Sequence, residues 1–118
     1  MRIAAFVAMI FALASPVFAD GYQRVDGRDR FLSVVKDRDL TRLGIRVQVT
    51  DRGQIIGRAF GRSVSGAWLW RDGYFCRDLY WGGSELDLGN CQLVEVNGNS
   101  VRFTSDKGAG ESAALRLK

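Results

Sequence analysis

Between residues 66 and 83 the chain concentrates the side chains that could bind or transform a small molecule. The segment reads GAWLWRDGYFCRDLYWGG and holds all three tryptophans, two of the three tyrosines and one of the two cysteines. Aromatic faces bind apolar or sugar-like groups, and a guanidinium binds an anion through charge-assisted hydrogen bonds. We therefore expect a ligand-binding surface here, built from Trp70, Arg77, Asp78, Tyr80 and Trp81.

The same segment also fits a structural role. In an extended YFCRDLYW, residues 74–81, successive side chains point to opposite faces, so Arg77 lies on one face and Asp78 on the other. In a closed sheet one of them points toward the interior, where an ionised group must be paired. On this alternative Arg77 pairs with Asp72, Asp87 or Glu95, and the core is filled by Trp68, Trp70, Phe75 and Trp81.

Carboxylate catalysis is the alternative function. Glycoside cleavage uses two carboxyl groups at a defined separation, and a small hydrolase could draw two from Asp72, Asp78, Glu85 and Asp87. The chain has no histidine, which removes Ser-His-Asp and Cys-His catalysis and His-ligated zinc. The two cysteines form neither a zinc set nor a CxxC motif. We therefore assign no catalytic residue, no metal and no cofactor.

The first nineteen residues, MRIAAFVAMIFALASPVFA, have the pattern of a secretory signal peptide. Arg2 precedes an apolar run from Ile3 to Ala14, and the small-x-small sequence Val17-Phe18-Ala19 that follows predicts cleavage after Ala19. Pro16 interrupts the run, which is shorter than the roughly 20 apolar residues of a membrane span. We expect residues 20–118 to be a single periplasmic or secreted domain with no membrane span.

Export predicts a disulfide between Cys76 and Cys91. Disulfides persist in oxidising compartments, and two cysteines allow one intramolecular pairing. A domain of this size buries only a modest core, so a covalent link between distant residues stabilises it appreciably. The alternative is a pair of buried free thiols.

The charge pattern argues against nucleic-acid or anionic-lipid binding. The net charge is only +4. A basic thread runs from Arg24 to Arg46, but four aspartates between residues 26 and 39 interrupt it. Interspersed signs are typical of a solvated helix face rather than of a track for phosphates.

Hydrophobic periodicity predicts one helix followed by an antiparallel sheet. Residues 26–39 carry apolar doublets at helical spacing, with Asp26 as N-cap and Asp29 in capping-box position. From Gly44 onward the period is two, and turn signals such as Asp72-Gly73 and Asn97-Gly98 separate the strands. The strands are expected at 45–50, 54–60, 67–70, 74–81, 91–96, 101–105 and 112–118, with a bulge or bend at Gly57. This pattern predicts a mainly β meander that closes into a small barrel or compact sandwich.

One family resemblance follows from GRAFGRSVSGAWLWRDGYFCRDLYWG at 57–82, NCQ at 90–92 and VRFTSDKGAG at 101–110. This pattern resembles a group of short exported alphaproteobacterial proteins, which often carry the label dihydrodipicolinate reductase. The resemblance implies an exported β-rich domain and carries over no catalytic residue. A reductase of that kind has a dinucleotide-binding domain built from βαβ units. Residues 20–118 are too few for such a two-domain enzyme, and their sequence lacks the βαβ pattern. We therefore expect that the label does not describe the chemistry of this protein.

Together these observations predict a binding or accessory protein of the cell envelope. Its partner would be a small anionic or sugar-like ligand, or another envelope protein.

Overall fold

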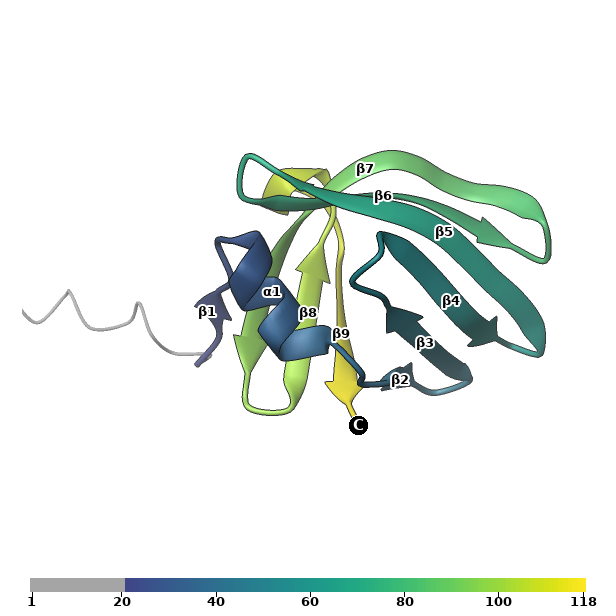
Figure 1. Cartoon of the computed structure of the whole chain (residues 1–118), viewed down its shortest axis with the longest axis horizontal. Coiled ribbons are helices and arrows are strands. Elements are labelled where there is room, and N and C mark those ends of the chain that lie inside the picture. Colours follow the sequence, from purple (N-terminus) through teal and green to yellow (C-terminus); the bar gives the residue numbers. More distant parts are fainter. Residues whose placement is uncertain (1–20) are drawn as a thin grey trace, which may run out of the picture.

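The computed structural model describes residues 21–118, which form a closed eight-stranded antiparallel barrel with one short N-terminal helix (Figure 1). The predicted fold class is confirmed, and of the two architectures considered the chain adopts the barrel. The signal peptide predicted at 1–19 lies outside the described residues.

The barrel strands follow the chain in order. They are β2 (Leu40–Arg42), β3 (Ile45–Val49), β4 (Gln54–Ala59), β5 (Arg62–Arg71), β6 (Tyr74–Trp81), β7 (Ser84–Asn97), β8 (Ser100–Thr104) and β9 (Ser112–Leu117). The remaining elements are the short strand β1 (Gln23–Arg24), the helix α1 (Arg28–Val35) and the 3-10 turn η2 (Asp106–Gly108).

Closure depends on the pairing between the first and last barrel strands. Each strand from β2 to β8 pairs with the next one along the chain, and Leu40 of β2 lies opposite Leu117 of β9. The predicted meander is therefore confirmed. β7 is 14 residues long, so it continues past the end of β6, where β1 pairs with it through Arg24 and Glu95.

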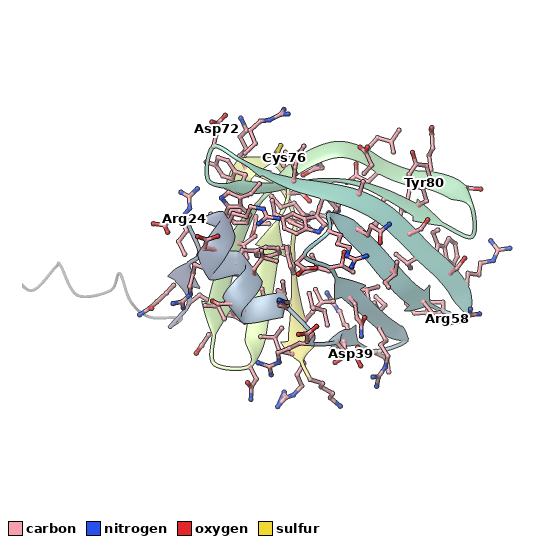
Figure 2. All side chains as sticks on the ribbon, in the orientation of Figure 1. Arg24, Asp39, Arg58, Asp72, Cys76 and Tyr80 are labelled. Carbon is pink, nitrogen blue, oxygen red and sulfur yellow. A yellow bond between two sulfur atoms is a disulfide. The ribbon has the colours of Figure 1, made fainter. Side chains whose placement is uncertain are left out.

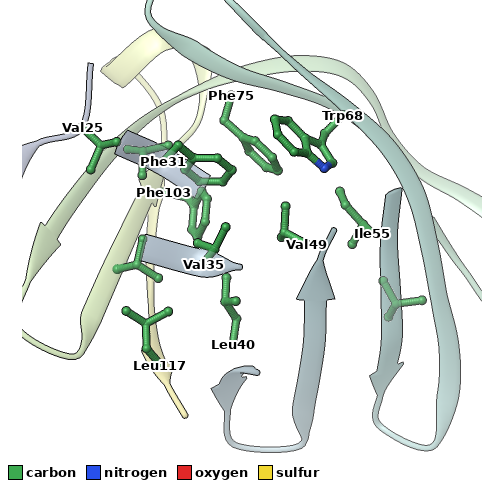
Figure 3. Packing of buried hydrophobic residues seen from close by; sticks show 13 residues of the cluster. Val25, Phe31, Val35, Leu40, Val49, Ile55, Trp68, Phe75, Phe103 and Leu117 are labelled. Atoms are coloured by element: carbon green, nitrogen blue, oxygen red, sulfur yellow. The ribbon is translucent and has the colours of Figure 1, made fainter. Parts of the chain in front are cut away.

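An aromatic cluster fills the end of the barrel that α1 covers. Phe31 of α1 is fully buried, and its ring centroid lies 5.0 to 6.4 Å from those of four other rings. Those rings belong to Trp68, Trp70, Phe75 and Phe103, and Figure 3 shows three of them gathered around Phe31. Trp68, Trp70 and Phe75 of the 66–83 segment therefore contribute to the core, as the structural alternative predicted.

The helix is shorter than its sequence pattern predicts. α1 begins after Gly27 rather than after Asp26, and no side chain caps it, so the predicted N-cap and capping box are wrong. The helix ends at Val35, and Asp37 adopts a left-handed backbone with φ of 59°. Phe31 and Val35, one helical turn apart, are its buried contacts. The chain must then reverse to enter β2.

Asp39, the residue directly before β2, is hydrogen-bonded to two side chains of β3. Its carboxylate accepts a hydrogen bond from Gln48 Nε2 at 2.8 Å and another from the guanidinium of Arg46. The Gln48 and Arg46 hydrogen bonds hold the pKa of Asp39 below its usual value. Arg46 is therefore an ion-paired residue of the outer wall.

Two strand glycines allow neighbouring backbones to approach closely. Pairing is regular through Gly57, with Val47 on one side and Val64 on the other, so the predicted bulge is absent there. A Cβ on Gly57 would lie 2.2 Å from the carbonyl oxygen of Arg46, and a Cβ on Gly66 would lie 2.2 Å from that of Asp78. Both distances are too short for any side chain, so these positions admit only glycine without a backbone shift.

Gly66→Ala is expected to lower the free energy of unfolding by about 2 kcal/mol, because β5 and β6 must separate to accommodate the methyl group. Urea denaturation measures the change. The matched control is Ser65→Ala, at the adjacent exposed position of the same strand, where we expect a change within about 0.5 kcal/mol. Equal stability of the two variants would contradict the close approach.

Candidate functional site

The interior of the barrel contains an apolar cavity of about 430 Å³. Every strand from β2 to β9 contributes lining residues, and all lining side chains but two are apolar. The exceptions are Arg77 of β6 and Gln92 of β7. Pockets for small molecules typically measure about 300 to 1,000 Å³ and combine apolar walls with a few placed polar groups, so this cavity has the size and composition of a ligand site.

The cavity is closed at one end of the barrel and reaches the surface at the other. Phe75 and Phe103 line it and also pack against Phe31, so they form its floor beneath α1. Phe60 and Leu86 line it as well, yet they are 68% and 58% exposed. These two residues therefore mark the mouth, at the end of the barrel remote from the helix.

Arg77 is the cation of the cavity. Its side chain is only 12% exposed, and its Nη1 donates a hydrogen bond to Asp87 Oδ2 at 3.1 Å. The sequence left three carboxylates open as the partner of Arg77, and the structure shows that the partner is Asp87. The β6–β7 ladder shifts register between Arg77 and Leu79, so Asp87 does not lie directly opposite Arg77, where Asn90 lies instead. Such irregularities commonly reorient side chains beside binding sites.

Trp81 lines the cavity near its mouth and is held in place from two sides. Its indole Nε1 donates a hydrogen bond to the carbonyl oxygen of Ala59 at 2.8 Å. The guanidinium carbon of Arg62 lies 5.2 Å from the ring centroid, within the range of a cation–π contact. The indole is therefore a fixed wall of the cavity.

The structure does not bring the other three predicted ligand-binding residues to the cavity. Trp70 belongs to the aromatic cluster, 5.1 Å from Phe31, and its buried indole N–H has no hydrogen-bond partner within the described chain. Asp78 accepts a hydrogen bond from the backbone N–H of Gly89 at 2.7 Å. Asp78 and Tyr80 alternate with the cavity-lining residues of β6, so they lie on the outer face. The five residues of the predicted ligand-binding surface therefore lie in three separate regions, which are the cavity, the aromatic cluster and the outer face of β6.

The four carboxylates considered for hydrolysis are also dispersed. Asp72 lies in the β5–β6 turn, at one end of β6, whereas Glu85 lies near the other end of β6, across from Tyr80 (Figure 2). Asp78 and Asp87 have the partners described above, and none of the four lines the cavity. Between residues 21 and 118, no three side chains of the metal-ligating types converge.

Cys76 and Cys91 form the predicted disulfide. They lie directly opposite each other on β6 and β7. Cys76 alternates with the cavity-lining Phe75 and Arg77, so the bond lies on the outside of the sheet. A disulfide in a small domain indicates an oxidising compartment. Within residues 21–118, no helix has the length and hydropathy to cross a bilayer.

Sequence reasoning missed Gln92, the second polar residue of the cavity, and the wall residues Ala113 and Leu115 of β9. The alternation of SAALRLK places Ala113 and Leu115 on the same face of a strand, and this pattern could have identified them as residues of the barrel interior.

Comparison with family models, with curated proteins and with solved structures gave no match to this chain. The resemblance to short exported proteins therefore stays a prediction. The strand pairings of the described chain are all antiparallel, so it contains no parallel βαβ unit of the kind that binds dinucleotides.

Proposed function

We propose that this protein is a periplasmic or secreted binding protein that holds a small amphipathic anion inside its barrel. The ligand would have an apolar chain or ring body and one acidic group, such as a carboxylate. The observation that carries the proposal is an apolar cavity, walled by all the barrel strands, with a single guanidinium that is largely buried. The disulfide and the signal-like residues 1–19 support the extracytoplasmic location.

The composition of the wall favours an apolar ligand body over a sugar. Each buried hydroxyl of a sugar needs a hydrogen-bond partner, and an unpaired polar group costs free energy. Arg77 and Gln92 are the polar side chains of the wall, which is too few for a polyhydroxylated ligand. An alkyl chain or ring, by contrast, gains by leaving water for such a wall.

Arg77 would hold the acidic group. A guanidinium has five N–H donors, and the hydrogen bond of this side chain within the described residues uses one of them, toward Asp87. The side chain of Asp87 is 42% exposed, so it stays hydrated if an incoming carboxylate takes its place. Binding would therefore exchange one anionic partner of Arg77 for another, without leaving a buried charge unpaired.

Calorimetric titration with dodecanoate and with dodecanol tests both parts of the proposal. We expect saturable binding of both, because the apolar body enters the cavity, and about 10- to 100-fold tighter binding of dodecanoate, because a charge-assisted hydrogen bond contributes about 1.5 to 3 kcal/mol. Arg77→Gln should abolish this preference. Asp87→Asn should strengthen dodecanoate binding, because it removes the competing carboxylate.

A matched pair on β9 locates the ligand. Ala113 lines the cavity, whereas Ala114 is exposed on the outer face of the same strand. Ala113→Phe should fill the cavity and abolish binding of both probes, while Ala114→Phe should leave both affinities unchanged. Equal loss in the two variants, or no saturable binding by the unsubstituted protein, would refute a ligand inside the barrel.

A further inference from the structure

Three hairpin turns lie side by side at the mouth of the cavity. The backbone N–H of Phe60, in the β4–β5 turn, donates to the carbonyl oxygen of Gly44 in the β2–β3 turn at 2.8 Å. The N–H of Gly82, in the β6–β7 turn, donates to the carbonyl oxygen of Ser63 on β5 at 2.8 Å. Figure 1 shows all three turns at the end of the barrel remote from α1.

These turns combine exposed apolar tips with arginines. Leu43 is 92% exposed and Phe60 is 68% exposed, the two highest values among the large hydrophobic residues of the described chain. Beside them lie the exposed residues Arg42, Arg58 and Arg62. We call these five residues the turn rim.

The rim arginines carry uncompensated charge. Arg58 donates to the carbonyl oxygen of Gly61, and Arg62 stacks on Trp81, so both are oriented by neutral groups. Within residues 21–118, the ion pairs involve other cations, such as Arg46 with Asp39 on the outer wall. The fold thus brings Arg42 of the β2–β3 hairpin together with Arg58 and Arg62, which flank the β4–β5 turn.

We propose that the turn rim docks on an anionic lipid surface, with Leu43 and Phe60 inserted among the lipids and the three arginines at the headgroups. Exposed apolar tips flanked by basic side chains are the combination that binds the interface of an anionic bilayer, since apolar burial and charge attraction act together. A strongly acidic protein surface would satisfy the arginines but would leave the isolated Leu43 tip without a hydrophobic environment. The rim surrounds the cavity mouth and shares Phe60 with the cavity lining, so a variant with a filled cavity is needed to separate docking from ligand binding.

Vesicle sedimentation tests the proposal. The protein used comprises residues 20–118, which contain the whole barrel, because all buried core residues of the described chain lie between Val25 and Leu117. We expect it to sediment with vesicles made of equal parts of phosphatidylcholine and phosphatidylglycerol, and to stay in solution with vesicles of phosphatidylcholine alone. Added salt should weaken the binding, because it screens the charge attraction.

Two rim variants separate the contributions of charge and apolar insertion. Replacing Arg42, Arg58 and Arg62 together by glutamine should lower the apparent affinity for anionic vesicles by more than about tenfold. Leu43→Ser combined with Phe60→Ser should also lower it at constant net charge. Circular dichroism melts confirm that each variant is folded before its binding is measured.

The chain provides matched controls for both variants. Arg30, Arg52 and Arg71 are exposed away from the rim, so changing these three to glutamine alters net charge equally and should leave vesicle binding within about twofold. Leu69→Ser, at a 46% exposed position on the outer wall of β5, is the apolar control. Equal losses in rim and control variants would overturn the proposal, as would equal binding to both kinds of vesicle.

The cavity-filled variant Ala113→Phe distinguishes docking from ligand uptake. It should still sediment with anionic vesicles, even though it no longer binds dodecanoate. Loss of vesicle binding in this variant would show that the protein is retained by lipid in the cavity and would overturn docking through the rim. Absence of vesicle binding, together with a dimer that Leu43→Ser and Phe60→Ser dissociate, would assign the rim to a second copy instead.

Discussion

Phe31→Ala is expected to lower the free energy of unfolding by about 3 to 5 kcal/mol, the range for truncating a buried phenylalanine. Phe31 is fully buried and touches four aromatic rings, two of which form the floor of the cavity. Truncation removes the anchor that fixes α1 to the barrel and leaves a void beneath it. For a domain whose total stability is expected at about 5 to 15 kcal/mol, this is a large fraction.

Urea denaturation of the oxidised protein, followed by far-ultraviolet circular dichroism, measures the loss. Phe60→Ala is the matched control, because it removes the same side chain at a position that is 68% exposed. We expect that control to change stability by no more than about 0.5 kcal/mol. A Phe31 variant as stable as the Phe60 variant would show that the helix does not close the barrel.

The fold could be predicted where local pattern and tertiary pairing agree. Alternation over 45–50 and 54–60 predicted β3 and β4 within a residue or so, and 74–81 coincides with β6. The first half of β7, residues 84–90, was missed because SELDLGN has few strand-forming residues and is held extended by its pairing with β6. β2 was missed because three residues are too few to show a period.

The site could be predicted only in part, because it depends on closure of the barrel. Alternation placed Arg77 and Trp81 on one face of a strand, and both line the cavity. It could not say which face is interior, so Asp78 and Tyr80 of the outer face were included. Arg42 belongs to a different hairpin from Arg58 and Arg62, and the three meet only because the β2–β3 and β4–β5 turns align. The linear sequence therefore shows no continuous basic run at these positions.

Removal of the disulfide is the second large effect that we expect. Replacing Cys76 and Cys91 together by alanine should lower the free energy of unfolding by about 3 kcal/mol, because the bond closes a loop with a sequence separation of 15 and restricts the unfolded chain. Reduction of the native protein should give a similar loss. Reductant should not change the stability of the double alanine variant. That variant is therefore the control for any effect of the reductant other than cleavage of this bond.

Stability and ligand binding should respond differently to this change. The sulfur atoms lie on the outside of β6 and β7, whereas Arg77, Gln92 and the apolar wall face inward. The double alanine variant that remains folded at low temperature should therefore bind dodecanoate with an affinity within about threefold of that of the native protein. A much larger loss of affinity would mean that the bond holds the β6–β7 register at Arg77, since Cys76 is its neighbour in the chain. The disulfide would then be part of the binding site as well as a source of stability.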